Sequence, residues 1–281
     1  MVNLKKVVII TGGSSGIGKS TVLKLLENNF TVYTGARNID KMKDIEKKGA
    51  KISFLDVTQE ETMKKFVEKV ISKEKRIDIL INNAGYGSYG AVEDVPIEEA
   101  KRQFEVNLFG LARMTQLVLP IMRQQRSGKI INISSVGGKI WMPMGTWYHA
   151  SKHAVEGFTD CLRNEIKQFG INAILIEPGA INTSWGKITV DNLRKRSENG
   201  AYKKIANIIA DSFYNIYEVK KSGLSSDKVA EVIIKSIKSN KPKARYAVPF
   251  QAKMLLFLRR LLNDNTFDSL LLKFFKIPKK F

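Results

Sequence analysis

The segment TGGSSGIGKS, Thr11 to Ser20, fits two kinds of phosphate-binding loop, and each kind belongs to a different class of protein. One is the nucleoside-triphosphate loop G-x-x-x-x-G-K-[ST], in which Lys19 would bind the phosphates and Ser20 a magnesium ion. The other is a dinucleotide-binding pattern, T-G-x-x-x-G-x-G, whose key glycines are Gly12, Gly16 and Gly18. Both loops join a strand to a helix, because both direct backbone N–H groups at phosphate oxygens. The rest of the chain must therefore decide between them.

Short apolar, β-branched runs alternate with longer helical patterns along the chain. We expect strands at Val7–Ile10, Thr31–Thr34, Ile52–Leu55, Ile77–Ile81, Lys129–Ile133, Ala173–Ile176 and Arg245–Val248. Two long helices are expected over Glu98–Arg123 and Tyr148–Phe169. The strand runs are apolar without alternation, which is typical of parallel strands that are covered on both faces. The pattern predicts one α/β domain over residues 1–281, a Rossmann-like, doubly wound parallel sheet of about seven strands with helices on both faces.

Composition excludes several other classes of protein. The chain has one cysteine, Cys161, and two histidines, so neither a disulfide framework nor a His/Cys metal cluster is expected. The N-terminal MVNLKK contains no secretory signal, and no run approaches the ~20 apolar residues of a membrane span, so a cytoplasmic protein is expected. The net charge of +20 indicates either an anionic partner or a lysine-rich, solvated surface. Because zinc-finger spacing and aromatic RNA-binding signatures are missing, nucleic acid is not an expected partner.

A candidate acid–base pair lies in WYHASKHAVEGF, where Tyr148 and Lys152 have the i, i+4 spacing of one helix face. Tyrosine has an ordinary pKa of about 10, and a lysine ammonium ~4 Å away would lower it toward neutral pH. The pair alone is weak evidence, because Tyr217 and Lys221 have the same spacing. Only Tyr148 is preceded, thirteen residues earlier, by a serine at a strand end, Ser135. Parallel sheets place their chemistry at such strand ends, so we favour the first pair.

These motifs together resemble those of the short-chain dehydrogenases/reductases. TGGSSGIG, NNAG (Asn82 to Gly85), FEVNLFG, ISSVGG, YHASK and PGAINT (Pro178 to Thr183) occur in the order and spacing of that family. The resemblance covers about residues 4 to 248. It is greatest to the branch that contains hydroxysteroid and retinol dehydrogenases and acyl-dihydroxyacetone-phosphate reductases. The opening segment is then a dinucleotide loop, and Lys19 and Ser20 are helix residues.

The resemblance implies roles for particular residues. Tyr148 would be the general acid or base, Lys152 would lower its pKa and hold the nicotinamide ribose, and Ser135 would polarise the carbonyl. Asn107 would kink its helix and hold a water molecule for a proton relay. The implied cofactor-binding residues, besides Tyr148 and Lys152, are Gly12, Ser14, Ser15, Gly16, Ile17, Gly18, Arg37, Asp56, Val57, Asn83, Ala84, Gly85, Pro178, Gly179 and Thr183.

The end of the second strand favours NADP(H) over NAD(H). NAD-selective sites of this fold carry an acid there, which binds the ribose 2′-hydroxyl. In VYTGARN that position is Ala36, and Arg37 follows it. A guanidinium can bind a 2′-phosphate with two hydrogen bonds, whereas a carboxylate would repel it.

Three further segments concern the substrate and partners. The apolar side chains Trp141, Met142, Met144 and Trp185 predict a substrate wall for a bulky apolar ketone or aldehyde, steroid-, retinoid- or acyl-like. Residues about 185–225 are polar and lysine-rich, and we expect them to form a lid. Residues about 250–281 are expected to form one or two amphipathic helices that either pack on the protein or lie on an anionic membrane.

In that C-terminal extension, helical projection groups Met254, Leu255, Phe257, Leu258, Leu261 and Leu262 opposite Lys253, Arg259 and Arg260. The family resemblance also implies a homodimer or homotetramer through the two long helices, with interface positions at Leu108, Leu111, Val118 and Phe158. The leading hypothesis is thus an NADP(H)-dependent oxidoreductase. A cofactor-binding sensor without turnover and a sugar-nucleotide epimerase or dehydratase are the alternatives.

Overall fold

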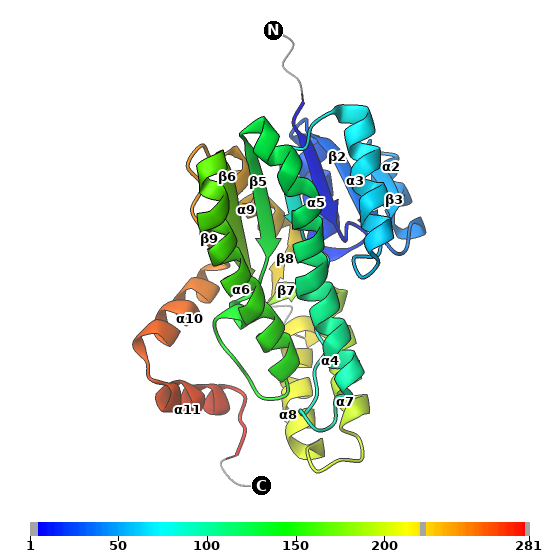
Figure 1. Cartoon of the computed structure of the whole chain (residues 1–281). Helices are drawn as coiled ribbons and strands as arrows, with labels where there is room; N and C mark the ends of the chain where they lie inside the picture. Colours follow the sequence, from blue (N-terminus) through cyan, green and yellow to red (C-terminus); the bar gives the residue numbers. More distant parts are fainter. Residues whose placement is uncertain (1–4, 220–222, 279–281) are drawn as a thin grey trace.

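The computed structural model describes residues 5–219 and 223–278. Seven parallel strands form one sheet in the order β3-β2-β1-β4-β5-β6-β9 (Figure 1). Their bounds are β1 Val7–Thr11, β2 Thr31–Ala36, β3 Lys51–Phe54, β4 Ile79–Asn82, β5 Gly128–Ile133, β6 Ile171–Pro178 and β9 Arg245–Val248. The predicted fold class is confirmed. Since strand order reverses between β1 and β4, their carboxyl ends form the crevice in which this kind of sheet binds ligands.

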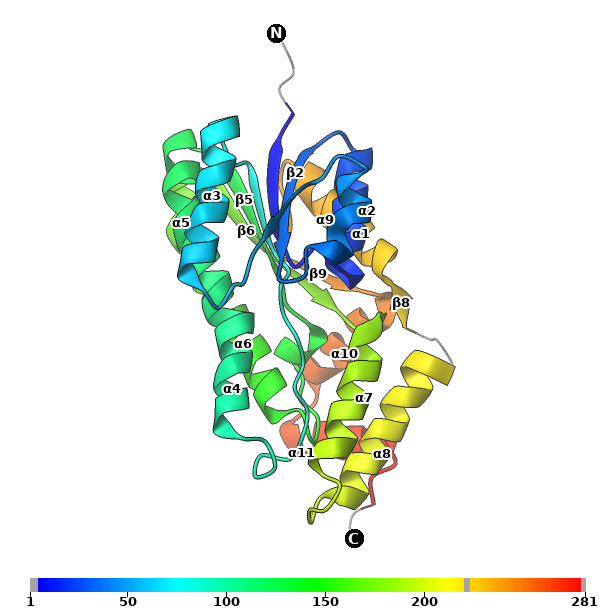
Figure 2. The same ribbon diagram turned by 90° about the vertical axis from the view of Figure 1, so that its right-hand side faces the viewer.

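Helices cover both faces of the sheet (Figure 2). One layer contains α1 (Gly16–Glu27), α2 (Lys43–Glu46) and α9 (Ser226–Lys238), and the other contains α3 (Glu60–Glu74), α5 (Gly110–Gln125) and α6 (Thr146–Ile166). Strand β1 shows why its sequence lacks alternation. Val8 and Ile10 enter the first core, whereas Val7 and Ile9 enter the second. Each face of the strand is therefore buried under helices.

The helix predicted over Glu98–Arg123 is divided in two. Helix α4 (Ile97–Phe104) passes through a π-helical turn, Glu105–Phe109, into α5. Four interface positions were expected on these long helices, and two of them are wrong. Val118 is fully buried in the core under the sheet, and Leu111 is also buried within the chain, because the apolar face of α5 covers its own sheet. Leu108 and Phe158 are only partly buried.

The segment expected to form a lid contains α7 (Ser184–Arg196), α8 (Lys203–Tyr214) and a π-helical turn, Asn215–Val219. It connects a two-stranded parallel sheet, β7 (Ile181–Asn182) and β8 (Leu224–Ser225). Its apolar side chains form a third core together with residues before α6 and with the C-terminal helices. Lys221 of the second Tyr-x-x-x-Lys pair lies outside the described residues. The segment is thus packed below the carboxyl edge of the main sheet (Figure 2).

The chain ends in two helices, α10 (Phe250–Leu261) and α11 (Asp264–Phe274). The projected apolar face is correct only in part. Leu255 and Leu262 pack on the third core, and Arg259, expected on the cationic side, turns inward to place its guanidinium 4.3 Å from the Trp141 ring centre. The remaining projected apolar residues point outward. Within the described ranges, no helix has the length and apolar character needed to cross a membrane.

Candidate active site

Hydrogen bonds from the segment after β4 fix the glycine loop. Thr11 Oγ1 accepts hydrogen bonds from the backbone N–H groups of Asn83 (3.1 Å) and Ala84 (3.0 Å). The Asn83 amide returns two, to the carbonyls of Thr11 (3.0 Å) and Gly12 (3.1 Å). At Gly18 a Cβ atom would lie 2.2 Å from the Gly12 carbonyl oxygen, so only glycine fits there. The loop is a tight backbone cradle, which suits the pyrophosphate of a dinucleotide.

The two residues that suggested a triphosphate loop have other partners. Lys19 lies on α1 and forms an ion pair with Asp44 (2.7 Å). The Ser20 hydroxyl is buried and lies 2.8 Å from the hydroxyl of Ser226 on α9. Both side chains thus have partners on other helices or segments, which agrees with the dinucleotide interpretation.

The predicted acid–base pair lies on the first turns of α6, beside the end of β5. Tyr148 and Lys152 are both buried. The Lys152 ammonium donates a hydrogen bond to the Ile133 carbonyl (2.8 Å). Ser135 follows that strand, and its hydroxyl accepts a hydrogen bond from the Gly137 N–H (3.0 Å). The structure therefore brings the predicted serine, tyrosine and lysine together where the strand ends.

Burial determines the proton affinities of the pair. It raises the pKa of Tyr148, and the hydrogen bond with Ser135 offsets part of that rise. It also lowers the pKa of Lys152 to about 8, against the opposing charge of Glu156. The expected lowering of the tyrosine pKa is therefore not observed. Desolvation disfavours charge on both groups and exceeds the other effects on each.

Asn107 lies in the π-helical turn between α4 and α5 and is buried. Its Oδ1 accepts a hydrogen bond from the Tyr86 N–H, and its Nδ2 donates to the Tyr86 carbonyl and to Ser151, each at 3.0 Å. A Cβ atom at Gly85 would lie 3.1 Å from Asn107 Oδ1 and 3.8 Å from Lys152 Nζ. The turn thus brings the asparagine amide to the same small space as the lysine ammonium.

The other predicted cofactor contacts lie around the same crevice. Asp56 Oδ1 accepts two hydrogen bonds from Thr58, which fixes the bend after β3, and Val57 is buried next to it. Arg37 follows β2, is exposed, and has no hydrogen bond or ion pair with the described residues. Thr183 caps α7, and a Cβ atom at Gly16 would lie 3.2 Å from its methyl group. The segment expected to form a lid therefore starts beside the glycine loop.

An aromatic cluster covers Tyr148, the predicted general acid or base. The Tyr148 ring centre lies 5.5 Å from that of Tyr89 and 5.7 Å from that of Trp185. Tyr217 and Phe213 extend the cluster, at 6.0 Å from Trp185 and 5.4 Å from Tyr89 respectively. Sequence reasoning predicted only Trp185. Tyr89, Phe213 and Tyr217 carry no motif, and Tyr217 was interpreted only as half of a chance acid–base pair.

The other predicted wall residues divide into two groups. Met144 belongs to the third core, as Tyr148 does, and the partly buried Met142 packs against it. Trp141 contacts the C-terminal helices. Its indole N–H donates a hydrogen bond to Asp268 (2.6 Å), and its ring packs edge-on against Phe267. Trp141 therefore anchors α11 beside the site.

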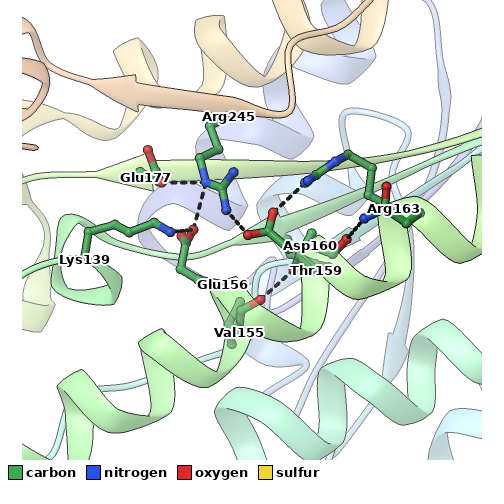
Figure 3. Close-up of polar contacts among 10 residues, drawn as sticks. Lys139, Val155, Glu156, Thr159, Asp160, Arg163, Glu177 and Arg245 are labelled. Carbon is green, nitrogen blue, oxygen red and sulfur yellow. Dashed lines mark hydrogen bonds and ion pairs between the residues drawn. The ribbon is translucent and has the colours of Figure 1, made fainter. Parts of the chain in front are cut away.

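A network of charged side chains around the buried Glu156 and Glu177 joins α6 to β6 and β9 (Figure 3). Arg245 Nε on β9 lies 3.1 Å from Glu156 Oε2 on α6 and 3.4 Å from Glu177 Oε1 on β6. The guanidinium also pairs with Asp160, one turn further along α6. Lys139 pairs with Glu156 at 3.3 Å. One arginine thus holds three carboxylates from two elements.

The two buried carboxyl groups, Glu156 and Glu177, lie close together and share the positive charges of Arg245 and Lys139. Burial and the adjacent Glu156 raise the pKa of Glu177 to about 7, against the opposing charges of Arg245 and Lys139. Glu177 directly precedes Pro178 and Gly179, which are predicted to contact the nicotinamide. The charge state of Glu177 can therefore affect the segment that is predicted to bind the nicotinamide.

Comparisons with known proteins agree with this geometry. The family model described as "short chain dehydrogenase" matches residues 6–193. A 3-ketodihydrosphingosine reductase of Bacteroides thetaiotaomicron is 35% identical, and the alignment covers 97% of this chain and 98% of the relative. An NADPH-dependent 3-dehydrocapnine reductase of Ornithobacterium rhinotracheale is also 35% identical, with 97% of each chain covered.

A solved structure supports the same assignment. The crystal structure of a short-chain dehydrogenase from Streptomyces avermitilis superimposes with a TM-score of 0.78 at 27% identity, and 98% of each chain is covered. The chain therefore belongs to the short-chain dehydrogenase/reductase family and is an oxidoreductase of carbonyl and alcohol groups that uses a nicotinamide dinucleotide.

Proposed function

We propose that this protein reduces a ketone or aldehyde on a bulky apolar molecule with NADPH. The observation that carries the proposal is the group of partly buried Ser135 with buried Tyr148 and Lys152 beneath an aromatic cover. When bound, the reduced nicotinamide supplies a hydride to the carbonyl carbon. Everything else that the reaction needs comes from the protein.

In this mechanism Tyr148 donates its hydroxyl proton to the carbonyl oxygen as hydride reaches the carbon. Its raised pKa keeps the hydroxyl protonated at neutral pH, which suits an acid for reduction. Ser135 donates a hydrogen bond to the same oxygen and stabilises its developing charge. Lys152, protonated below about pH 8, supplies the replacement proton, and Asn107 positions the route by which it arrives.

The choice of NADPH is supported by Arg37 and by the missing acid at the end of β2. Arg37 is exposed and has no partner among the described residues, so its guanidinium is available for a 2′-phosphate. The 3-dehydrocapnine reductase is named as NADPH-dependent. Both facts favour NADPH over NADH.

The substrate class is supported by the rings that surround Tyr148. Tyr89, Trp185, Phe213 and Tyr217 offer apolar and edge-on aromatic contacts, which favour a hydrocarbon over a sugar. Two relatives are named for reducing a 3-keto and a 3-dehydro compound. We therefore rank a ketone on a long alkyl chain first, before a steroid or a retinoid.

The test is consumption of NADPH, followed by its absorbance, with a panel of ketones and aldehydes. The panel should contain a 3-keto sphingoid base, a steroid ketone, retinal and a small sugar ketose. We expect turnover with apolar members and none with the ketose. If NADPH binds but no compound is reduced, the protein is a sensor and the proposal is wrong.

We also propose a cytoplasmic homo-oligomer that forms through α4 and the start of α6. A hollow of about 390 Å³ there is lined by the apolar side chains Ile97, Phe104, Phe109 and Trp147 among others. Ile97 and Phe109 are exposed in the single chain. Light scattering should show a dimer or tetramer, and Phe109→Glu should shift it toward the monomer. A wild-type monomer at micromolar concentration would contradict this assembly.

A further inference from the structure

Helix α10 presents an apolar face to the outside. Phe250, Met254, Phe257, Leu258 and Leu261 recur at helical spacing, and between 39% and 68% of each residue's surface is exposed. Figure 1 shows α10 and α11 at the margin of the molecule, away from the two helix layers. An apolar face of this size on the outside of a folded chain usually marks an interaction surface.

The fold itself does not need this face. The opposite side of α10 already makes the contacts that attach the helix. Ala252 is buried, Leu255 and Leu256 pack on the third core, and Arg259 lies over Trp141 and pairs with Asp264 (2.7 Å). The exposed side chains are thus additional to the packing of the helix.

Positive charge surrounds the apolar face. Lys253 and Arg260 flank it on α10, Lys273 lies on α11, and Lys276 follows the end of α11. All four are exposed, and none makes an ion pair with a described residue. The two aspartates of α11 are exposed but already have partners within the chain, because Asp264 pairs with Arg259 and Asp268 accepts a hydrogen bond from the Trp141 N–H. Unpaired cations around exposed Phe, Leu and Met side chains are typical of helices that lie on anionic lipid.

We propose that α10 and α11 dock on an anionic bilayer, with the apolar face among the headgroups and the cations at the phosphates. A second copy of the chain fits this face less well. Two-fold pairing would bring the four cations close to those of the other copy, in a protein whose net charge is already +20. Anionic lipid satisfies both the apolar and the positive groups.

Docking at this surface would place the bilayer beside the active site. The first turn of α10 lies next to the nicotinamide segment, because a Cβ atom at Gly179 would be 3.4 Å from the Ala252 Cβ. Helix α11 contacts Trp141, in the loop that leads to Tyr148. An apolar substrate could therefore pass from the bilayer to the aromatic cluster with little exposure to water. The docking itself does not depend on the proposed reaction.

The experiment is sedimentation of the full chain with vesicles, without substrate or cofactor. Vesicles of phosphatidylcholine alone are compared with vesicles of phosphatidylcholine and phosphatidylglycerol in equal amounts. We expect binding only to the anionic vesicles and release by high salt. The double variant Lys253→Gln/Arg260→Gln should lower the partition coefficient at least about tenfold, because each basic residue near an anionic surface contributes roughly fivefold.

Charge alone could attract so basic a protein, so the apolar face needs its own variant. Phe257→Ser/Leu261→Ser should lower the partition coefficient at least about tenfold. The matched control, Ile39→Ser/Phe54→Ser, removes two exposed apolar side chains far from α10 and should bind as the wild type does. The proposal would be overturned if Phe257→Ser/Leu261→Ser bound the vesicles as well as Ile39→Ser/Phe54→Ser does. It would also be overturned if the wild type did not sediment with anionic vesicles at low salt. Light scattering in which Phe257→Ser/Leu261→Ser turns a dimer into a monomer would overturn it as well.

Discussion

On one side of Tyr148 hydrogen bonds fix the backbone, whereas on the other side the contacts are between aromatic rings. Four hydrogen bonds between Asn83, Ala84, Thr11 and Gly12 hold the glycine loop. Over the tyrosine, the ring centres of Trp185, Phe213 and Tyr217 lie 5.4–6.1 Å from those of neighbouring rings in the cluster, with the rings tilted or edge-on. Hydrogen bonds demand one geometry, but apolar contacts tolerate rearrangement. The first side suits an invariant cofactor, and the second suits entry of a large substrate.

The largest effect should come from the residue where the two sides meet. Tyr148→Phe removes the acid but keeps the ring in its cluster, so turnover should fall at least ~100-fold while NADPH binding stays nearly unchanged. Steady-state kinetics and fluorescence titration measure the two. Tyr217→Phe is the matched control, because Tyr217 lies in the same cluster and should lose little activity. Equal losses in both variants would mean that Tyr148 acts only through packing.

The second prediction tests the hydrogen-bonded side of the site, where the cofactor is expected to bind. Arg37→Ala should weaken NADPH roughly 10- to 100-fold, since hydrogen bonds to a charged group are worth about 1.5–3 kcal/mol. NADH lacks the phosphate, and its affinity should change only slightly. Fluorescence titration of both cofactors gives the comparison, with Lys41→Ala as a control for loss of nearby charge. Equal weakening of NADPH and NADH would show that Arg37 is structural.

The third prediction, with a smaller expected effect, tests the aromatic side of the site, where the substrate is expected to bind. At Gly87 a Cβ atom would lie 2.5 Å from the Trp185 ring, so Gly87→Ala must displace that ring from the cluster. We expect KM for an apolar ketone to change about tenfold, with NADPH affinity unchanged. Gly157→Ala is the control, because, apart from the adjacent backbone of α6, no described atom lies within 4 Å of its added Cβ. If Gly87→Ala leaves KM unchanged, the aromatic cover is not part of the substrate site.

The same difference explains what the sequence could predict. The polar side is built from contiguous segments such as Thr11–Gly18 and Asn83–Gly85, whose glycines and strand ends follow from local chemistry. The sheet was predictable for the same reason, because its strands are uninterrupted apolar runs. The aromatic cover joins Tyr89, Phe213 and Tyr217, which are far apart in sequence, and packing brings them together without any local signal. The inward turn of Arg259 likewise depends on Trp141, more than a hundred residues away.

The buried carboxyl groups beneath the site could not be predicted from the sequence either. Glu156 and Glu177 look like ordinary surface residues until β6, β9 and α6 enclose them around Arg245. The charge of Glu156 also raises the pKa of Lys152, which lies one turn earlier on α6, although the burial of Lys152 has the larger, opposite effect. Such groups carry the last and smallest prediction.

The pKa of Glu177 in the folded chain is raised to about 7, whereas a free glutamate has a pKa near 4.5. Between these values the folded state binds more protons than the unfolded state, so the free energy of unfolding falls as pH rises from about 4.5 to about 7. The glutamine of Glu177→Gln resembles the protonated carboxyl. The variant should therefore remove this pH-dependent change in the free energy of unfolding, which is on the order of 1 kcal/mol. Urea unfolding of wild type and variant at pH 5 and pH 8 measures it.

Asp160→Asn is the matched control. Burial acts against ionisation of Asp160, but Arg245 and Arg163 outweigh it and hold the pKa below its ordinary value. That stabilisation is lost only as pH falls below about 4, so Asp160→Asn should destabilise the protein equally at pH 5 and pH 8. A wild-type slope that persists in Glu177→Gln would mean that another group binds the proton.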